Sequence, residues 1–185
     1  MSDFLNNGIC PKTRRIFLYG DVEEEAVGKA IRGIYAMLAT DKNAPITIFV
    51  SSYGGSLDDA MALVDVVRLA SCPIRTVALG KCMSAAPLIV AAGTGGRYAM
   101  PNTMWMLHDV SQNVGEGSPA FLSSMAKAGK SIVARYASLL GQWTDREESF
   151  WKGIFRSKSD RFFTSDDALD WGIVDEVFEE EEEEE

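Results

Sequence analysis

The chain has 185 residues, 46% of them hydrophobic, which is enough for one domain with a sizeable core and too short for two ordinary domains. Its formal net charge is −9, but seven of the 27 acidic residues form the run 179–185, so residues 1–178 carry 20 acids against 18 bases. This nearly neutral body has no basic patch and argues against nucleic-acid binding. No apolar run reaches the ~20 residues of a membrane span, and the polar start lacks the form of a secretory signal. We therefore expect a cytoplasmic protein without a membrane partner.

Strand-like and helical patterns alternate along the chain, which predicts an α/β domain with parallel crossovers. We expect three segments: a short N-terminal segment over 1–14, one domain over 15–178, and an acidic, disordered tail over 179–185. The predicted strands lie near 15–20, 46–51, 74–79, 97–100, 104–108 and 173–177, and the predicted helices near 22–39, 57–70, 84–92, 118–140, 144–155 and 165–171.

A glycine pair follows the second predicted strand, in the sequence Ser52-Tyr53-Gly54-Gly55-Ser56. Glycines after a strand are most often only a turn. They also allow backbone N–H groups to face a ligand, so this loop is a candidate part of an anion-binding site.

The third predicted strand leads into Gly80-Lys81-Cys82-Met83-Ser84 and then into a helix. Ser84 is either a helix N-cap or a nucleophile beside the free N–H groups of the helix start. Pro87, in the first turn of that helix, costs it little. Cys82 is an alternative nucleophile, but strand alternation places it in a different environment from the turn residue.

His108, the only histidine, stands at the end of the predicted strand near 104–108. A lone histidine there is usually structural, but beside a serine it is a candidate general base. Such a base needs an orienting carboxylate, and Asp160 in Lys158-Ser159-Asp160-Arg161 is the candidate. The three cysteines, Cys10, Cys72 and Cys82, lack metal-ligand spacing, so we expect free thiols and no metal site.

These motifs, in this order and spacing, resemble the ClpP family of serine peptidases over 15–177, nearly the whole chain. The resemblance rests on the glycine loop, the turn before Ser84, the strand end at His108, the segment around Asp160, and Trp171-Gly172-Ile173-Val174-Asp175. The chain lacks the Gly-x-Ser-x-Gly elbow of the α/β-hydrolases.

The resemblance implies a role for each candidate residue. Ser84 is then the nucleophile, His108 the base and Asp160 the acid, with the N–H groups of Gly55 and Ala85 as oxyanion donors. A substrate peptide would be held as an added strand. The residues implied to bind it are Gly54, Ser56 and Leu57 on one side and Ser111, Gln112 and Asn113 on the other.

The resemblance also implies a ClpP/crotonase-like fold of repeated β-β-α units with a projecting handle helix at 118–140. It implies a homo-oligomer of heptameric rings stacked in pairs, with active sites in an enclosed chamber. The implied function is serine endopeptidase cleavage of peptides or unfolded proteins through an acyl-enzyme, without cofactor or metal. For this chain we expect such cleavage to be ATP-independent.

Three departures from the family bear on these expectations. Only fourteen residues precede the first predicted strand, which leaves docking of an unfoldase ATPase open. Lys158-Ser159 stands where the family has an Asp-Arg pair that links rings to active sites. Tyr53 replaces a proline, and Asp109-Val110 replaces a Gln-Pro pair beside the substrate groove.

Two alternatives remain at this point. Crotonases share the fold and use a paired oxyanion hole on acyl-CoA without needing a Ser/His/Asp set. A ClpR-like ring subunit is catalytically weak or inactive and typically lacks triad residues, whereas all three candidates are present here.

Overall fold

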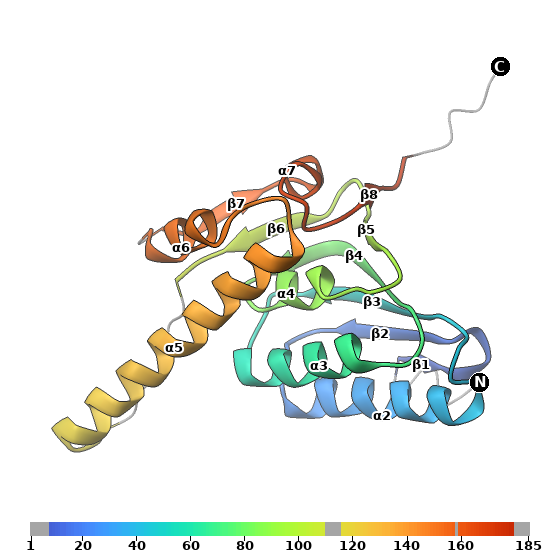
Figure 1. The fold of residues 1–185 in the computed structure, drawn as a ribbon, viewed down its shortest axis with the longest axis horizontal. Coiled ribbons are helices and arrows are strands. Elements are labelled where there is room, and N and C mark those ends of the chain that lie inside the picture. The colour runs from blue at the N-terminus through green and yellow to red at the C-terminus, as the bar shows by residue number, and fades with distance from the viewer. Residues whose placement is uncertain (1–7, 110–115, 158, 180–185) are drawn as a thin grey trace.

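A computed structural model describes residues 8–109, 116–157 and 159–179. The described residues alternate between strands and helices, as predicted (Figure 1). The strands are β1 (Ile9–Cys10), β2 (Arg15–Tyr19), β3 (Ile46–Ser52), β4 (Ile74–Met83), β5 (Arg97–Ala99), β6 (Met104–Leu107), β7 (Arg161–Phe163) and β8 (Glu176–Val177). The helices are the 3₁₀ helix η1 (Pro11–Thr13) and the α-helices α2 (Glu24–Thr40), α3 (Leu57–Leu69), α4 (Ala86–Ala91), α5 (Pro119–Trp143), α6 (Glu148–Arg156) and α7 (Ser165–Asp170).

The strands form one sheet in the order β1-β2-β3-β4-β5-β8. Pairing is parallel from β2 to β8, and β1 runs antiparallel to β2. The second half of β4 separates from β5 and pairs in parallel with β6, which in turn pairs antiparallel with β7. The α/β class with parallel crossovers is therefore confirmed.

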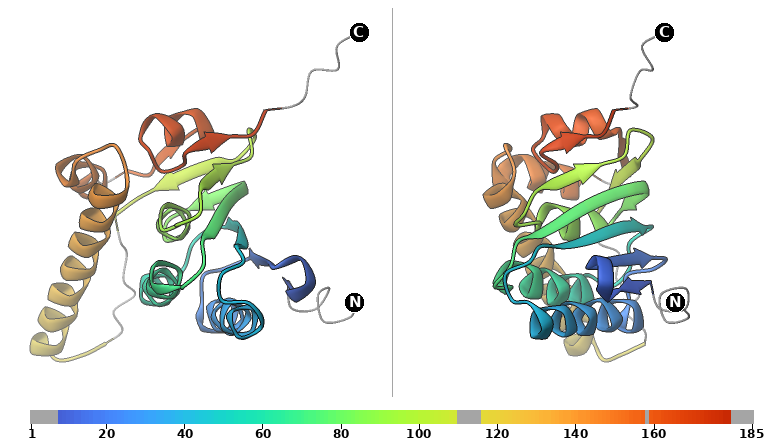
Figure 2. Two further views of the ribbon diagram at one scale, coloured as in Figure 1. Left: turned by 45° about the vertical axis from the view of Figure 1, so that its right-hand side comes forward. Right: turned by 90° about the vertical axis from the view of Figure 1, so that its right-hand side faces the viewer.

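The core lies between this sheet and α2, α3 and α4, which cover one of its faces (Figures 1 and 2). In β2, Ile16 and Leu18 are buried while their neighbours are partly or fully exposed, which is the period-two pattern of a half-buried strand. Helix α3 begins at the N-cap Ser56, whose hydroxyl accepts a hydrogen bond from the Asp59 N–H at 3.2 Å. The glycine loop therefore ends in a fixed helix start.

Helix α5 has an exposed half and a buried half. It begins after the N-cap Ser118, and its first part extends away from the rest of the fold (Figure 1). Phe121 and Leu122 in this part are 49% and 40% exposed. The C-terminal part is anchored in the core by Tyr136, Ala137, Leu139 and Leu140. None of the described helices, including α5, is both long and apolar enough to cross a membrane.

Some predicted boundaries were wrong. Strand β4 does not end near residue 79 but continues to Met83, because after Gly80 (φ +66°) it gains β6 as a new partner. The last strand spans only Glu176–Val177, and the helix predicted from residue 144 begins at Glu148. The first strand was expected near Arg15, but Ile9–Cys10 precedes it and pairs with β2. Strand β7 was not predicted.

Candidate active site

Three neighbouring strand ends bring the candidate residues together. Ser52 of β3 pairs with Cys82 of β4, and Cys82 pairs with Trp105 of β6. Because these strands are parallel, the segments that follow them emerge at the same edge of the sheet. Those segments are the glycine loop, the Ser84 turn and the strand end at His108. This edge is also where ligands bind in many α/β folds.

Ser84 has a backbone conformation that L-residues rarely adopt. Its φ is +57°, one of two positive values among the described non-glycine residues. The left-handed region costs an L-residue about 1–2 kcal/mol, so the surroundings must hold it there. The Ser84 N–H donates to the carbonyl oxygen of Met106 at 2.8 Å, and the Tyr136 hydroxyl donates to the Ser84 carbonyl oxygen at 2.8 Å. These bonds fix the turn from two sides.

The Ser84 hydroxyl and the His108 ring are in direct contact. Ser84 Oγ lies 2.7 Å from His108 Nε2, within the range of a hydrogen bond between a nucleophile and its base. If the hydroxyl donates, Nε2 is unprotonated and Nδ1 carries the ring proton. Both side chains are half-buried, so the pair is reachable from solvent.

Asp160 lies beside His108 in the strand register but does not bond to it. Strands β6 and β7 pair Trp105 with Phe163 and Leu107 with Arg161. The next position of this antiparallel register sets Asp160 opposite His108. Asp160 is exposed, and no partner for its carboxylate is found in the part of the chain that the structure describes.

The glycine loop packs directly on the Ser84 turn. A Cβ added to Gly54 would lie 2.5 Å from Ser84 Cβ and 3.0 Å from the Ala85 nitrogen, so only glycine allows this approach. Val22 fixes the loop, because its N–H donates to the Gly54 carbonyl and its carbonyl accepts from the Ser56 N–H, both at 2.7 Å. Within the described residues, the N–H groups of Gly55 and Ala85 have no hydrogen-bond partner.

The structure describes three of the six residues that are implied to bind substrate. Gly54 is buried against Ser84, and Ser56 is exposed at the start of α3. Leu57 is 9% exposed and belongs to the core, so only its backbone can face a ligand. Ser111, Gln112 and Asn113 lie outside the described residues.

Cys82 is unsuited to act as the nucleophile. Its side chain is completely buried, and this burial raises the pKa of the thiol well above its ordinary value. A neutral, inaccessible thiol is unreactive. The two residues differ in environment for another reason than the predicted strand alternation, which would place residues two apart on the same face. Cys82 belongs to β4, whereas Ser84 follows the strand in a turn with a φ of +57°.

Tyr136 was not predicted as a site residue. Its contact with Ser84 spans 52 positions and joins the far half of α5 to a tight turn. The sequence shows Tyr136 only as one apolar position of an amphipathic helix, because its hydroxyl acquires a partner only through the tertiary fold. No local signal could have revealed it.

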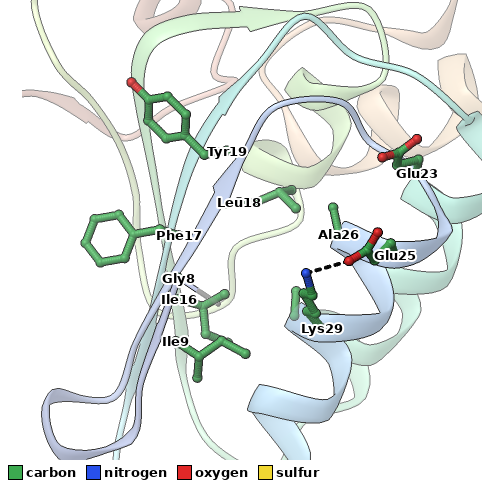
Figure 3. Close-up of a pocket in the computed structure, with 11 residues that line it drawn as sticks. Gly8, Ile9, Ile16, Phe17, Leu18, Tyr19, Glu23, Glu25, Ala26 and Lys29 are labelled. Carbon is green, nitrogen blue, oxygen red and sulfur yellow. Dashed lines mark hydrogen bonds and ion pairs between the residues drawn. The ribbon is translucent and has the colours of Figure 1, made fainter. Parts of the chain in front are cut away.

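A cavity of about 460 Å³ lies elsewhere, between β1, β2 and the start of α2 (Figure 3). Figure 3 shows Leu18 and Ala26 between β2 and α2, with Phe17 and Tyr19 on the other side of the strand. The polar groups that line it include the ion pair of Lys29 with Glu25, at 2.7 Å. None of the candidate catalytic residues lines this cavity. Across the described ranges, no group of three or more His, Cys, Asp or Glu side chains is arranged to hold a metal ion.

Comparison with known proteins gives one consistent family. A sequence model of the Clp protease family matches residues 7–181. The ATP-dependent Clp protease proteolytic subunit 2 of Nocardia farcinica is 32% identical over 90% of this chain and 81% of its own length. The proteolytic subunit 1 of Mycobacterium tuberculosis is 33% identical over 89% of this chain and 81% of its own length. The mixed α/β architecture agrees with the fold expected from the resemblance. By sequence match and by fold, this chain belongs to the Clp protease family.

Proposed function

We propose that this protein is a serine endopeptidase that cleaves peptides or unfolded proteins through an acyl-enzyme on Ser84. The observation that carries the proposal is the 2.7 Å contact between Ser84 Oγ and His108 Nε2, at a strained turn packed against the glycine loop. A serine that served only as a helix N-cap would not need a histidine at its hydroxyl. A crotonase-type reaction does not need this contact either.

The reaction assigned to these groups conserves every proton. His108 Nε2 takes the Ser84 hydroxyl proton as Oγ attacks the scissile carbonyl carbon. The N–H groups of Gly55 and Ala85 stabilise the negative oxygen of the tetrahedral intermediate. His108 then gives its proton to the leaving amine as the C–N bond breaks. In the second half, the same ring takes a proton from the water that attacks the ester carbonyl carbon, and it returns this proton to Ser84 Oγ as the ester C–O bond breaks. The second product leaves as a carboxylic acid, and Ser84 and His108 are restored.

Asp160 is proposed to orient His108 by accepting the Nδ1 proton in a hydrogen bond. The register of β6 and β7 supports this role, since it sets the two residues opposite each other at adjacent strand ends. The carboxylate has no competing partner among the described side chains, so no existing interaction would have to break for it to accept the Nδ1 proton. Asp160→Asn should then lower turnover by several orders of magnitude, ~10⁴ in a well-studied triad.

ATP is not required for this chemistry. Peptide-bond hydrolysis is carried by the nucleophile, base and oxyanion donors, and none of these steps needs a nucleotide. The relatives are named ATP-dependent proteolytic subunits. For this chain, we propose that peptides and unfolded proteins are cleaved without ATP, whereas folded substrates would need a partner that unfolds them.

Steady-state hydrolysis of a fluorogenic peptide library without ATP tests the proposal. The wild type should turn over peptides, Ser84→Ala and His108→Ala should lose nearly all turnover, and Cys82→Ala should retain it. Turnover that persists in Ser84→Ala would contradict the proposal. Turnover that instead disappears only in Cys82→Ala would move the nucleophile to the thiol.

A further inference from the structure

The hydroxyl of Tyr136 joins α5 to the backbone of the candidate nucleophile. It donates to the Ser84 carbonyl oxygen at 2.8 Å, and the Tyr136 side chain is 2% exposed. The contact involves the peptide group after Ser84 and not the reactive hydroxyl, which faces His108. Tyr136 therefore acts on the site only through the backbone.

The peptide group that Tyr136 holds also carries a proposed oxyanion donor. The Ser84 carbonyl and the Ala85 N–H belong to one planar trans peptide, so they point in opposite directions. When the carbonyl is held toward Tyr136, the Ala85 N–H is aimed away from α5, on the side where Gly54 packs against the turn. Rotation of this peptide would misdirect both groups together.

The turn needs such a restraint because Ser84 has a φ of +57°. A conformation of this kind persists only where the surroundings over-determine it. The Ser84 N–H is bound to the Met106 carbonyl oxygen, and this bond fixes the peptide before Ser84. The bond from Tyr136 fixes the peptide after it.

Tyr136 is itself held rigidly. Its ring packs on Phe155 of α6, with ring centroids 4.8 Å apart, and both residues are buried. Burial raises the pKa of the Tyr136 phenol well above its ordinary value, so the hydroxyl remains a donor at neutral pH. The donor is thus fixed in position and in protonation state.

We propose that Tyr136 is a positioning residue that aims the Ala85 N–H at the oxyanion site by holding the Ser84 carbonyl. This proposal rests on the peptidase function proposed above. It assigns to α5 a role in the chemistry of its own subunit. Because the oxyanion forms only in the transition state, the effect belongs in kcat and not in KM.

Tyr136→Phe removes the hydroxyl and keeps the ring that packs on Phe155. We expect kcat per active site to fall about 10- to 100-fold, below or near the loss of a whole oxyanion donor, with KM within about twofold of wild type. Active sites are counted by the stoichiometry of fluorophosphonate labelling. Dividing the rate by this count distinguishes a lower kcat in each folded enzyme from a smaller fraction of folded enzyme.

Thr103→Val is the matched control. Thr103 is 4% exposed, and its hydroxyl donates to the Ala78 carbonyl oxygen at 3.2 Å, so the variant also removes a buried hydroxyl-to-carbonyl bond. We expect it to lower thermal stability while leaving kcat per active site unchanged. An unchanged kcat in Tyr136→Phe, or an equal fall in both variants, would overturn the proposal.

Two further outcomes are distinguishable. If Ser84→Ala is labelled by the fluorophosphonate as strongly as the wild type is, the proposed function itself fails. This result is independent of any change at Tyr136.

If Tyr136→Phe does not fold, tetrafluorotyrosine is incorporated at position 136, where the fluorines strongly lower the phenol pKa and keep the ring. Raising the pH should then reduce kcat at constant KM in the substituted enzyme, with no matching fall in the wild type. Identical profiles would refute the role of the hydroxyl.

Discussion

Gly54 lies closer to the Ser84 turn than any residue with a side chain could. A Cβ at this position would lie 2.5 Å from Ser84 Cβ and 2.7 Å from the Met83 carbonyl oxygen, and its φ of +100° is unfavourable for an L-residue. The loop and the turn are therefore fitted to each other at backbone level. The distance between the N–H groups of Gly55 and Ala85, the proposed oxyanion donors, depends on that fit.

Gly54→Ala should reduce peptidase turnover about 100-fold, because displacements near 1 Å in a catalytic geometry have costs of this order. It should also lower the free energy of unfolding by about 1–3 kcal/mol. The control is Gly153→Ala in α6, where an added Cβ meets nothing within 4 Å. It should stabilise the helix by about 0.5–1 kcal/mol without changing turnover. Normal kinetics in Gly54→Ala would contradict the close-packed site.

Arg97 of β5 links the end of α5 to the segment between α7 and β8. Its side chain pairs with Asp175, just before β8, and its Nη1 donates to the carbonyl oxygens of Trp143 at 2.6 Å and Gly172 at 2.7 Å. Partial burial alone would raise the pKa of Asp175. The hydrogen bonds and charge of Arg97 outweigh this effect and hold the pKa below its ordinary value.

The stabilisation from this pair should depend on pH. Because the pKa of Asp175 is lower in the folded than in the unfolded chain, its contribution is fully present above the unfolded value, about 3.9, and is lost as pH falls through the folded value. At pH 7, Asp175→Asn should lower the free energy of unfolding by about 1 kcal/mol, discounted for its exposure. Urea unfolding across pH should show the difference from wild type shrinking below about pH 4. A difference that stays constant into acid would contradict this assignment.

Asp170→Asn serves as the comparison for that experiment. Asp170 pairs with Arg146 at 2.5 Å, but its side chain is 68% exposed against 46% for Asp175. Exposed ion pairs contribute little. We expect a change of at most a few tenths of a kcal/mol.

Most elements could be predicted because periodicity along the chain reports burial. The pattern of β2, with Ile16 and Leu18 inward, is visible in the sequence and survives in the structure. Strand β7 could not be predicted, because three residues have no period of their own and are a strand only through pairing with β6. The helix predicted near 165–171 is α7, but its N-cap, Thr164, and the bond from the Ser165 hydroxyl to the distant Met100 carbonyl oxygen became known only from the structure.

Some residues of the candidate site could likewise be predicted from the sequence, and others could not. Residue types and order favoured Ser84 and His108, and the structure sets them 2.7 Å apart. The bond from Tyr136 to Ser84 was not predictable, since it depends on how α5 packs over a distance of 52 residues. The candidate catalytic residues could therefore be predicted from the sequence, whereas the residue that holds their backbone is identified only by the three-dimensional fold.

The first part of α5 presents apolar side chains to solvent. Phe121 and Leu122 are about half exposed on a helix that extends beyond the body (Figure 2). We propose that this surface is covered by other copies of the chain in rings of about seven subunits, stacked in pairs. In the proposed assembly, the stacked rings would enclose the active sites.

A double variant, Phe121→Glu with Leu122→Glu, should shift the assembly to smaller species and reduce peptidase turnover. Sedimentation velocity at the concentration used for the assay measures both wild type and variant. Leu69→Glu alters another exposed apolar residue, 84% exposed at the end of α3, and should leave the stacking of rings unchanged. A fully active wild-type monomer would contradict the assembly proposal.

Mapping a fluorophosphonate adduct by mass spectrometry tests whether Ser84 is an activated nucleophile. We expect one adduct per subunit, located on Ser84, absent in Ser84→Ala and formed far more slowly in His108→Ala. Cys82→Ala should be labelled as the wild type is, because that thiol is completely buried. An unlabelled wild type, or an adduct on any residue other than Ser84, would show that Ser84 is not the nucleophile.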